Sequence, residues 1–379
     1  MLELPPLSLY IHIPWCEKKC PYCDFNSHQS ASVIPEQDYV QALIQDFAEE
    51  SHLLQGRAIE TIFIGGGTPS LFSASAYEQL FEALQKTAHF SSDIEITLEA
   101  NPGSAEANKF KAYRSAGINR LSIGVQSFND AQLQKLGRIH SADEALRAIE
   151  SANAAGFDNF NLDLMYGLPQ QSAAAAMDDL ASAIRCQPQH LSWYQLTIEP
   201  NTVFYSKPPK LPKEEPLHQI QEMGLALMQQ HGYHRYEVSA FAKHGSQCRH
   251  NLNYWGFGDY IGIGAGAHGK LSVVAEDRIY RKRKIKQPDH YLRNQLNRCA
   301  EVVEVEHEDR LLEFLMNGLR LKQGFSITSL ETRTGIAFRE IEKQVESLIQ
   351  QDLLVRREDT LAATDKGYLF IDSVLQKFL

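Results

Sequence analysis

The sequence predicts an α/β protein, a partial (β/α)6 barrel of parallel strands followed by a smaller, mainly helical, winged-helix-like C-terminal domain. Six strand-like apolar segments alternate with helical segments between residues 8 and 197, and such alternation favours a parallel sheet with right-handed crossovers. A full barrel of this kind has eight units, so six units indicate a partial one. The proline-rich segment 206–213 then interrupts the pattern, because proline fits neither a central strand nor the middle of a helix.

The six units are expected in the following order. Residues 8–13 alternate between apolar and polar side chains and are followed by Pro14, which predicts the first strand. The apolar run 61–64, which ends at three glycines, predicts a second, buried strand. The remaining strands are expected at 94–99, 119–124, 158–164 and 190–197, and the helices at 36–54, 74–88, 104–115, 129–136, 141–155 and 172–186.

Beyond the connector, the pattern becomes mainly helical. A helix is expected at 215–231, followed by an aromatic and glycine-rich segment at 233–270. The pattern of the C-terminal part predicts four helices, at 288–297, 307–322, 326–335 and 338–350. It also predicts a small β-wing, formed by 353–355 and 361–362. We therefore divide the chain into a barrel at 1–205, a segment at 206–298 that completes the barrel and faces heme or substrate, and a C-terminal domain at 299–379.

The net charge and the N-terminal sequence indicate which kinds of partner and which location to expect. Thirty-seven Lys and Arg against 47 Asp and Glu give a net charge of −10, which disfavours nucleic acid as a partner. The basic residues at 281–284 with Lys286 are expected to form a solvated strand or loop face. No signal-peptide pattern and no window of about 18 apolar residues is present, so we expect a cytoplasmic protein and leave peripheral membrane association open.

Three cysteines lie close together directly after the first strand. Cys16, Cys20 and Cys23 follow the spacing Cys-x3-Cys-x2-Cys, and a barrel of this type carries its chemistry in the loops after its strands. Three thiolates within eight residues suit one face of an iron-sulfur cluster and leave one iron without a cysteine ligand. The alternative is a zinc site, with His28 as the fourth ligand, or structural cysteines.

Polar residues also mark the ends of later strands. Gly65, Gly66 and Gly67 follow the second strand, and a backbone without side chains allows a ligand to approach closely. Further acceptor groups follow other strands, at Glu99, Gln126 and Asp163. Their oxygens suit ribose hydroxyls and an ammonium group, and Arg138 suits a carboxylate.

The cysteine spacing after a first strand resembles that of the radical S-adenosylmethionine (SAM) enzymes. In that family a 4Fe-4S cluster binds SAM through its fourth iron, and one electron from the cluster cleaves SAM to a 5′-deoxyadenosyl radical. Over nearly its full length, the chain resembles the oxygen-independent coproporphyrinogen III oxidase group of this family. The resemblance implies that SAM is contacted by Tyr10, Tyr22, Gly66, Gly67, Thr68, Glu99, Gln126, Arg138 and Asp163.

Two departures from that group favour another function. Phe25 stands where the oxidases have a further cysteine, and the first cysteine is already residue 16, so we expect no N-terminal extension like theirs. The segment His-Asn-Leu-Asn-Tyr-Trp at 250–255 resembles a feature of the HemW-type heme chaperones. This resemblance implies heme as a ligand, His250 as a candidate heme ligand, and heme-accepting proteins such as respiratory cytochromes as partners.

Two functions therefore remain in view. The first is a heme chaperone that binds a 4Fe-4S cluster and SAM and delivers heme. The alternative is a coproporphyrinogen III oxidase that makes protoporphyrinogen IX by oxidative decarboxylation of two propionates. The sequence leaves open whether the protein is an enzyme and whether it forms a homodimer.

Overall fold

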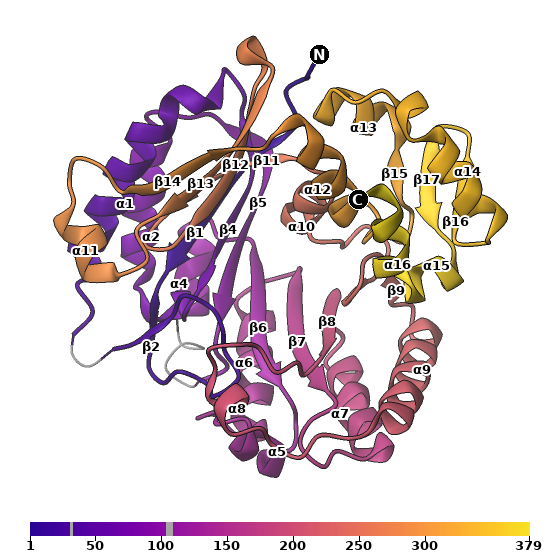
Figure 1. The fold of residues 1–379 in the computed structure, drawn as a ribbon. Helices are drawn as coiled ribbons and strands as arrows, with labels where there is room; N and C mark the ends of the chain where they lie inside the picture. The colour runs from indigo at the N-terminus through magenta and orange to yellow at the C-terminus, as the bar shows by residue number, and fades with distance from the viewer. Residues whose placement is uncertain (31–32, 104–108) are drawn as a thin grey trace.

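The fold is described by a computed structural model that covers residues 1–30, 33–103 and 109–379 (Figure 1). Within these ranges, the main sheet has the order β14-β13-β12-β11-β1-β4-β5-β6-β7-β8-β10-β9. Six neighbouring strands pair in parallel from one to the next, namely β1 (Leu7–Ile13), β4 (Ile59–Gly66), β5 (Phe90–Ala100), β6 (Arg120–Gln126), β7 (Phe160–Tyr166) and β8 (His190–Gln195). The predicted partial (β/α)6 barrel is thus confirmed.

Helices follow these strands along the chain. Several of them begin at a side chain that caps free backbone N–H groups: Ser73 and Ser172 each accept a hydrogen bond from the first turn, and Ser141 forms a capping box with Glu144. Of the predicted helix at 104–115, residues 104–108 lie outside the described residues. The helices are α1 (Glu36–Glu50), α2 (Ala74–Leu84), α4 (Phe110–Ser115), α5 (Asp130–Lys135), α6 (Ala142–Ala154) and α7 (Ala173–Arg185).

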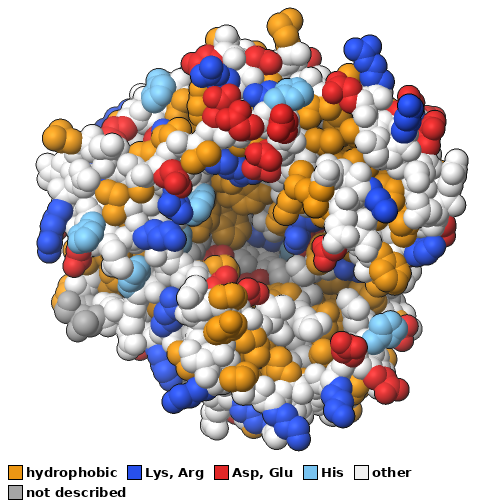
Figure 2. Space-filling view, viewed as in Figure 1, with side chains coloured by type: hydrophobic (Ala, Val, Ile, Leu, Met, Phe, Trp, Pro, Cys, Tyr) orange, Lys and Arg blue, Asp and Glu red, His pale blue; other side chains and the backbone are white. Residues whose placement is uncertain are grey.

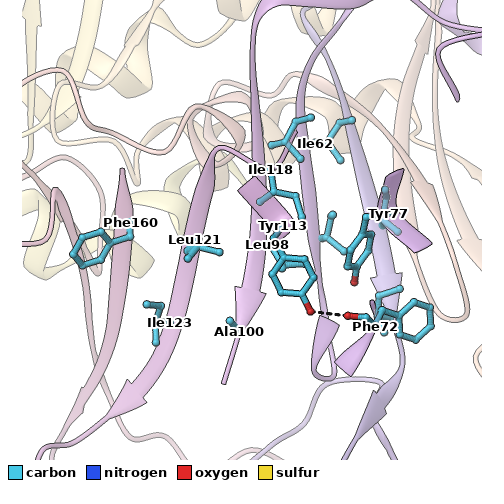
Figure 3. Close-up of a cluster of buried hydrophobic side chains, with 14 of the residues drawn as sticks. Ile62, Phe72, Tyr77, Leu98, Ala100, Tyr113, Ile118, Leu121, Ile123 and Phe160 are labelled. Carbon is cyan, nitrogen blue, oxygen red and sulfur yellow. Dashed lines mark hydrogen bonds between the residues drawn. The ribbon is translucent and has the colours of Figure 1, made fainter. Parts of the chain in front are cut away.

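Side chains between the sheet and these helices form the main hydrophobic core. Figure 3 shows Leu98 and Leu121 on neighbouring strands and Phe72, Tyr77 and Tyr113 beside them. The Tyr113 hydroxyl is buried, and it donates a hydrogen bond of 2.6 Å to the Phe72 carbonyl, which satisfies a polar group that burial would otherwise penalise. The core therefore fixes the strands whose ends carry the candidate site.

The sheet continues past both edges of the barrel. β11 (Asp259–Ile263) pairs in parallel with β1, and three antiparallel strands follow it, β12 (His268–Val273), β13 (Arg278–Lys284) and β14 (Cys299–Glu304). At the opposite edge lie β10 (Ala240–Ala242) and β9 (His234–Arg235). The predicted helix at 288–297 is shorter, α11 (Pro288–Arg293), and β14 was not expected, because its mostly exposed side chains give no apolar signal.

The basic residues at 281–284 form a strand, as predicted, but they are not simply a solvated face. Lys284 is buried and bonds to Asp46 at 2.5 Å and to Glu50 at 2.6 Å, and Lys282 bonds to Glu50 at 2.5 Å. Arg281 pairs with a carboxylate on a later helix. These contacts tie β13 to α1, so the expectation of a solvated face is wrong for Lys284.

The C-terminal part has its own hydrophobic core and the predicted wing. A three-stranded sheet in the order β15-β17-β16 packs with helices around that core. This winged-helix-like arrangement confirms the predicted fold class, whereas the boundaries at 205/206 and 298/299 stay a prediction. Its elements are α12 (His307–Gly318), β15 (Phe325–Ser326), α13 (Ile327–Thr334), α14 (Glu342–Gln350), β16 (Leu354–Arg357), β17 (Thr360–Ala363), α15 (Asp365–Leu369) and α16 (Ile371–Leu375).

Shorter elements complete the chain between the two cores. The proline-rich connector leads from α8 (Val203–Ser206) to α9 (Glu214–Gln230), and α10 (Arg249–Trp255) carries the His-Asn-x-x-Tyr-Trp segment. Among the helices that the structure describes, none is both long enough and apolar enough to cross a membrane.

Candidate functional site

A cavity of about 340 Å³ lies at the carboxyl ends of the barrel strands. Because parallel strands end at the same edge of a sheet, residues that follow different strands meet there. The cavity brings together all the predicted cluster and SAM residues except Tyr10: Cys16, Cys20, Tyr22, Cys23, Gly66, Gly67, Thr68, Glu99, Gln126, Arg138 and Asp163.

The cysteine loop is closed at its base by a short pair of strands. β2 (Trp15–Cys16) pairs with β3 (His28–Gln29), and the ammonium of Lys19 donates to the carbonyls of Phe25 and Ser27 at 3.1 and 3.0 Å. Burial raises the pKa of the Cys16 thiol, and the neighbouring Cys20 and Cys23 add to the shift by like-charge repulsion. A positively charged iron-sulfur cluster in the cavity that the three cysteines line would offset this repulsion.

The zinc alternative has weaker geometric support. Among the described residues, no group of three or more His, Cys, Asp or Glu side chains is placed to hold a metal ion. His28, the candidate fourth ligand, instead lies 3.3 Å from the Asn26 side-chain oxygen and is absent from the lining of the cysteine cavity. The three cysteines thus line one cavity that His28 does not reach among the described residues.

The glycines after β4 are required by close packing within the protein. A Cβ on Gly67 would lie 2.5 Å from the Trp15 carbonyl oxygen, and a Cβ on Gly66 would lie 2.5 Å from the His12 ring. Gly66 also has a φ of 114°, which favours glycine. The sequence argument expected ligand access as the reason for these glycines, and this stays a prediction. The structure adds that Gly66 makes room for the His12 ring and Gly67 for the Trp15 carbonyl.

Two carboxyl groups face the cavity in a buried setting. Burial, with the nearby Asp163, raises the pKa of Glu99 to about 8. Glu99 accepts a hydrogen bond of 3.1 Å from the Gly66 N–H. Burial also raises the pKa of Asp163, which accepts hydrogen bonds from Ser122 and Asn161 at 3.0 and 2.8 Å. A cationic ligand would relieve the cost of ionising Glu99, so this part of the cavity fits the ammonium of SAM.

Gln126 and Arg138 also line the cavity. Gln126 has a φ of 68°, an uncommon conformation for a residue with a side chain, and its amide oxygen accepts from the Tyr194 hydroxyl at 2.8 Å. Arg138 donates to the Asn101 side-chain oxygen and the Gly124 carbonyl, each at 2.8 Å. Arg138 also reaches the Cys20 sulfur at 3.6 Å, and its buried Nε has no partner among the described residues. This orphaned donor is available to a ligand.

Sequence reasoning missed Asn101 and Tyr194, which also line the cavity. Asn101 donates to Thr68 at 3.1 Å and accepts from Arg138, so it links two of the predicted residues. A signal was available, because side chains two positions apart on an extended chain share a face. Asn101 stands two positions after Glu99, and Tyr194 belongs to the last barrel strand.

Tyr10 and His250 lie outside this cavity. Tyr10 lines a neighbouring cavity of about 420 Å³, which shares Gly66 and Glu99 with the first. His250 is 1% exposed, its Nδ1 lies 2.7 Å from the Thr61 hydroxyl, and burial lowers its pKa to about 3. Its Nε2 has no partner among the described residues. Heme ligation by His250 stays a prediction, and it requires the covering side chains to move.

Comparisons with known proteins place this geometry in a class. Residues 10–182 match the radical SAM superfamily, and residues 305–370 match the HemN C-terminal domain. The solved structure of coproporphyrinogen III oxidase (HemN) from Escherichia coli, a radical SAM enzyme, superposes with a TM-score of 0.83 at 24% identity. The superposition covers 99% of this chain and 90% of that one. The protein is therefore a member of the radical SAM superfamily with the HemN fold.

Relatives in sequence narrow the class further. The heme chaperone HemW of Haemophilus influenzae is 51% identical over 100% of this chain and 99% of its own length. The heme chaperone HemW of Escherichia coli is 49% identical over the whole of both chains, and that of Bacillus subtilis is 35% identical over 98% of this chain and 99% of its own. The chain belongs to the HemW family.

Proposed function

We propose that the protein is a heme chaperone that binds a 4Fe-4S cluster and SAM and delivers heme to acceptor proteins such as respiratory cytochromes. The observation that carries the proposal is the one cavity that three cysteines share with the buried carboxyl groups of Glu99 and Asp163 and the buried guanidinium of Arg138. Family membership supports the heme part, because the relatives over the full length are named heme chaperones.

In this proposal the residues of the cavity divide into two sets. Cys16, Cys20 and Cys23 would hold the cluster, which supplies one electron to SAM when both are bound. Glu99 would face the SAM ammonium, because its buried carboxyl forms no ion pair with the described residues. Asp163 and Gln126 offer acceptor oxygens, and the orphaned Nε of Arg138 offers a donor.

Phe25 favours the chaperone over the oxidase. Its side chain is 63% exposed and lines the cavity at the place where the oxidases of this group have a further cysteine. A phenyl ring cannot donate a proton or ligate iron, so a group that the decarboxylation chemistry uses has no counterpart at this position. A cytoplasmic location, peripheral membrane association and homodimer formation stay predictions.

The test is to incubate the anaerobically reconstituted protein with coproporphyrinogen III and SAM, and to titrate a second sample with heme. We expect a stable heme complex and no protoporphyrinogen IX. Product formation without stable heme binding would replace the chaperone with the oxidase. Iron and sulfide analysis of the same samples shows whether the cluster was present in both.

A further inference from the structure

The second cavity, of about 420 Å³, stands beside the SAM cavity and shares three of its residues. Gly66 and Glu99 form part of both walls, and Phe25 lies at the junction. Figure 2 shows that the molecule is hollowed near the centre of the viewed face, with acidic, basic and histidine side chains around the hollow. A ligand in the second cavity would therefore lie next to SAM without displacing it.

Aromatic rings from three elements line this second cavity. Tyr10 comes from β1, Tyr254 from α10 and Tyr260 from β11. The Tyr254 and Tyr260 rings meet edge to face, with centroids 4.4 Å apart. Such rings offer large, rigid contact area, and their hydroxyls suit a ligand that has both apolar and polar parts. The lining thus fits a flat aromatic body such as a porphyrin.

Four imidazoles lie in or near this cavity, and they differ in whether a nitrogen is free. His28 does not line the cavity, and its Nε2 lies 3.3 Å from the side-chain oxygen of Asn26, which does. His12 lines the cavity, but its Nε2 donates to the Asn26 carbonyl at 2.8 Å and its Nδ1 lies 3.0 Å from the Tyr10 hydroxyl. His250 does not line the cavity, and the Tyr254 ring packs edge-on against it at 4.7 Å. His268, at the start of β12, lines the cavity and is exposed.

His268 also has the chemical state that iron ligation requires. Neither of its ring nitrogens forms a hydrogen bond with the described residues. Partial burial lowers its pKa, and the nearby Arg283, Lys286 and Arg281 lower it further. The ring is therefore neutral at neutral pH and keeps a lone pair for a metal.

The cavity also carries a cation suited to a carboxylate. Arg281 and Arg283 already pair with Glu313 and Glu301, whereas the Lys286 ammonium forms no ion pair within the described chain. Asp24 and Glu99 are the carboxyl groups in the same lining. A ligand whose carboxylate lies next to Lys286 would form an ion pair with the ammonium, and the opposite side of the ligand would contact the tyrosines.

We propose that heme occupies this second cavity, with His268 as an axial ligand of its iron and Lys286 as the partner of a propionate. The proposal rests on the proposed heme-binding function and assigns the place where heme binds. His250 acts in this arrangement as a positioning residue, because its ring supports Tyr254 from beneath. This account gives the His-Asn-x-x-Tyr-Trp segment an effect on heme without direct ligation.

The test is a heme titration of the anaerobically reconstituted, full-length protein, followed by its visible spectrum. His268→Ala should weaken heme binding by about tenfold or more and remove the spectrum of histidine-ligated heme. Added imidazole should restore that spectrum, since it refills the vacated iron position. His250→Ala should keep the histidine-ligated spectrum with a smaller loss of affinity. His244→Ala, which changes an exposed histidine elsewhere, should match the wild type.

The outcomes separate this inference from the function on which it rests. Wild-type affinity and spectrum in His268→Ala would overturn the inference alone, as would loss of the ligated spectrum only in His250→Ala. Failure of the wild type to bind heme would overturn the proposed function together with the inference. Iron-sulfur content and the melting curve of each variant show that a loss of heme binding is not a loss of folding.

Discussion

Glu99→Gln should stabilise the cluster-free fold at alkaline pH while weakening SAM binding. Burial first, and Asp163 second, raise the pKa of Glu99 from 4.5 to about 8. Between these values the folded chain holds a proton that the unfolded chain has released, so the free energy of unfolding falls as the pH rises through this window. Glutamine has nearly the same shape, can still accept from the Gly66 N–H, and cannot ionise.

The size of the change in unfolding free energy follows from the pKa shift of Glu99. At about 1.4 kcal/mol per pKa unit, ionising this carboxyl costs the fold about 5 kcal/mol once the pH is well above 8. The difference between variant and wild type should therefore be small at pH 4.5 and reach several kcal/mol near pH 9.

Denaturant unfolding of cluster-free protein at a series of pH values measures this difference. Glu82→Gln, which changes an exposed carboxyl on α2, is the matched control and should follow the wild type. Equal stabilities of Glu99→Gln and wild type at pH 9 would refute the reasoning, because they would show that Glu99 ionises in the fold without cost.

The SAM part of the prediction has its own measurement. If the SAM ammonium meets the ionised Glu99, binding must release the proton, and the affinity should rise about tenfold from pH 6 to pH 7. Calorimetry of the reconstituted protein in two buffers with different ionisation enthalpies counts that proton. Glu99→Gln should bind SAM more weakly and release none, and an unchanged pH dependence in this variant would contradict the role.

Substitutions of the cluster cysteines, of Gly67 and of Arg138 test other parts of the cavity. Replacement of Cys16, Cys20 or Cys23 by Ala should remove most of the iron after anaerobic reconstitution, whereas the control variant Cys299→Ala should retain it. Full iron retention in one of the three variants would show that its cysteine is not a cluster ligand. Gly67→Ala should lower the free energy of unfolding by about 1–3 kcal/mol, because its Cβ meets the Trp15 carbonyl at 2.5 Å; unchanged denaturant unfolding would show that the loop adapts. Arg138→Lys keeps the positive charge but loses the hydrogen bonds of the guanidinium to Asn101 and Gly124. Calorimetry should therefore show SAM binding weakened by about ten- to a hundredfold. Wild-type affinity for SAM would mean that the charge alone suffices.

The barrel could be predicted because its strands are buried on both faces. Strands such as β4 and β6 consist mostly of buried side chains. In β4 a short apolar run that ends at glycines marks the C-terminal end of the strand. β14 lies at the sheet edge with mostly exposed side chains, so its residues are polar as well as apolar. Its place depends on pairing with β13, which no local pattern indicates.

The candidate site was predictable to the extent that topology determines it. Once the strands are parallel, their carboxyl ends converge, and polar residues such as Glu99 and Asp163 must meet. The surroundings of His250 were not predictable in this way. Its backbone N–H bonds to Glu95 and its ring to Thr61, more than 150 residues earlier in the chain, so its burial depends on contacts between distant segments.

The most direct test of the account is the transfer of heme. The reconstituted protein, loaded with heme and SAM, is mixed with increasing amounts of a heme-free cytochrome, and the visible spectrum follows the acceptor. A chaperone that passes heme by contact should transfer it at a rate that rises with the acceptor concentration. A rate that stays equal to spontaneous heme release, at every acceptor concentration, would contradict the proposed delivery function.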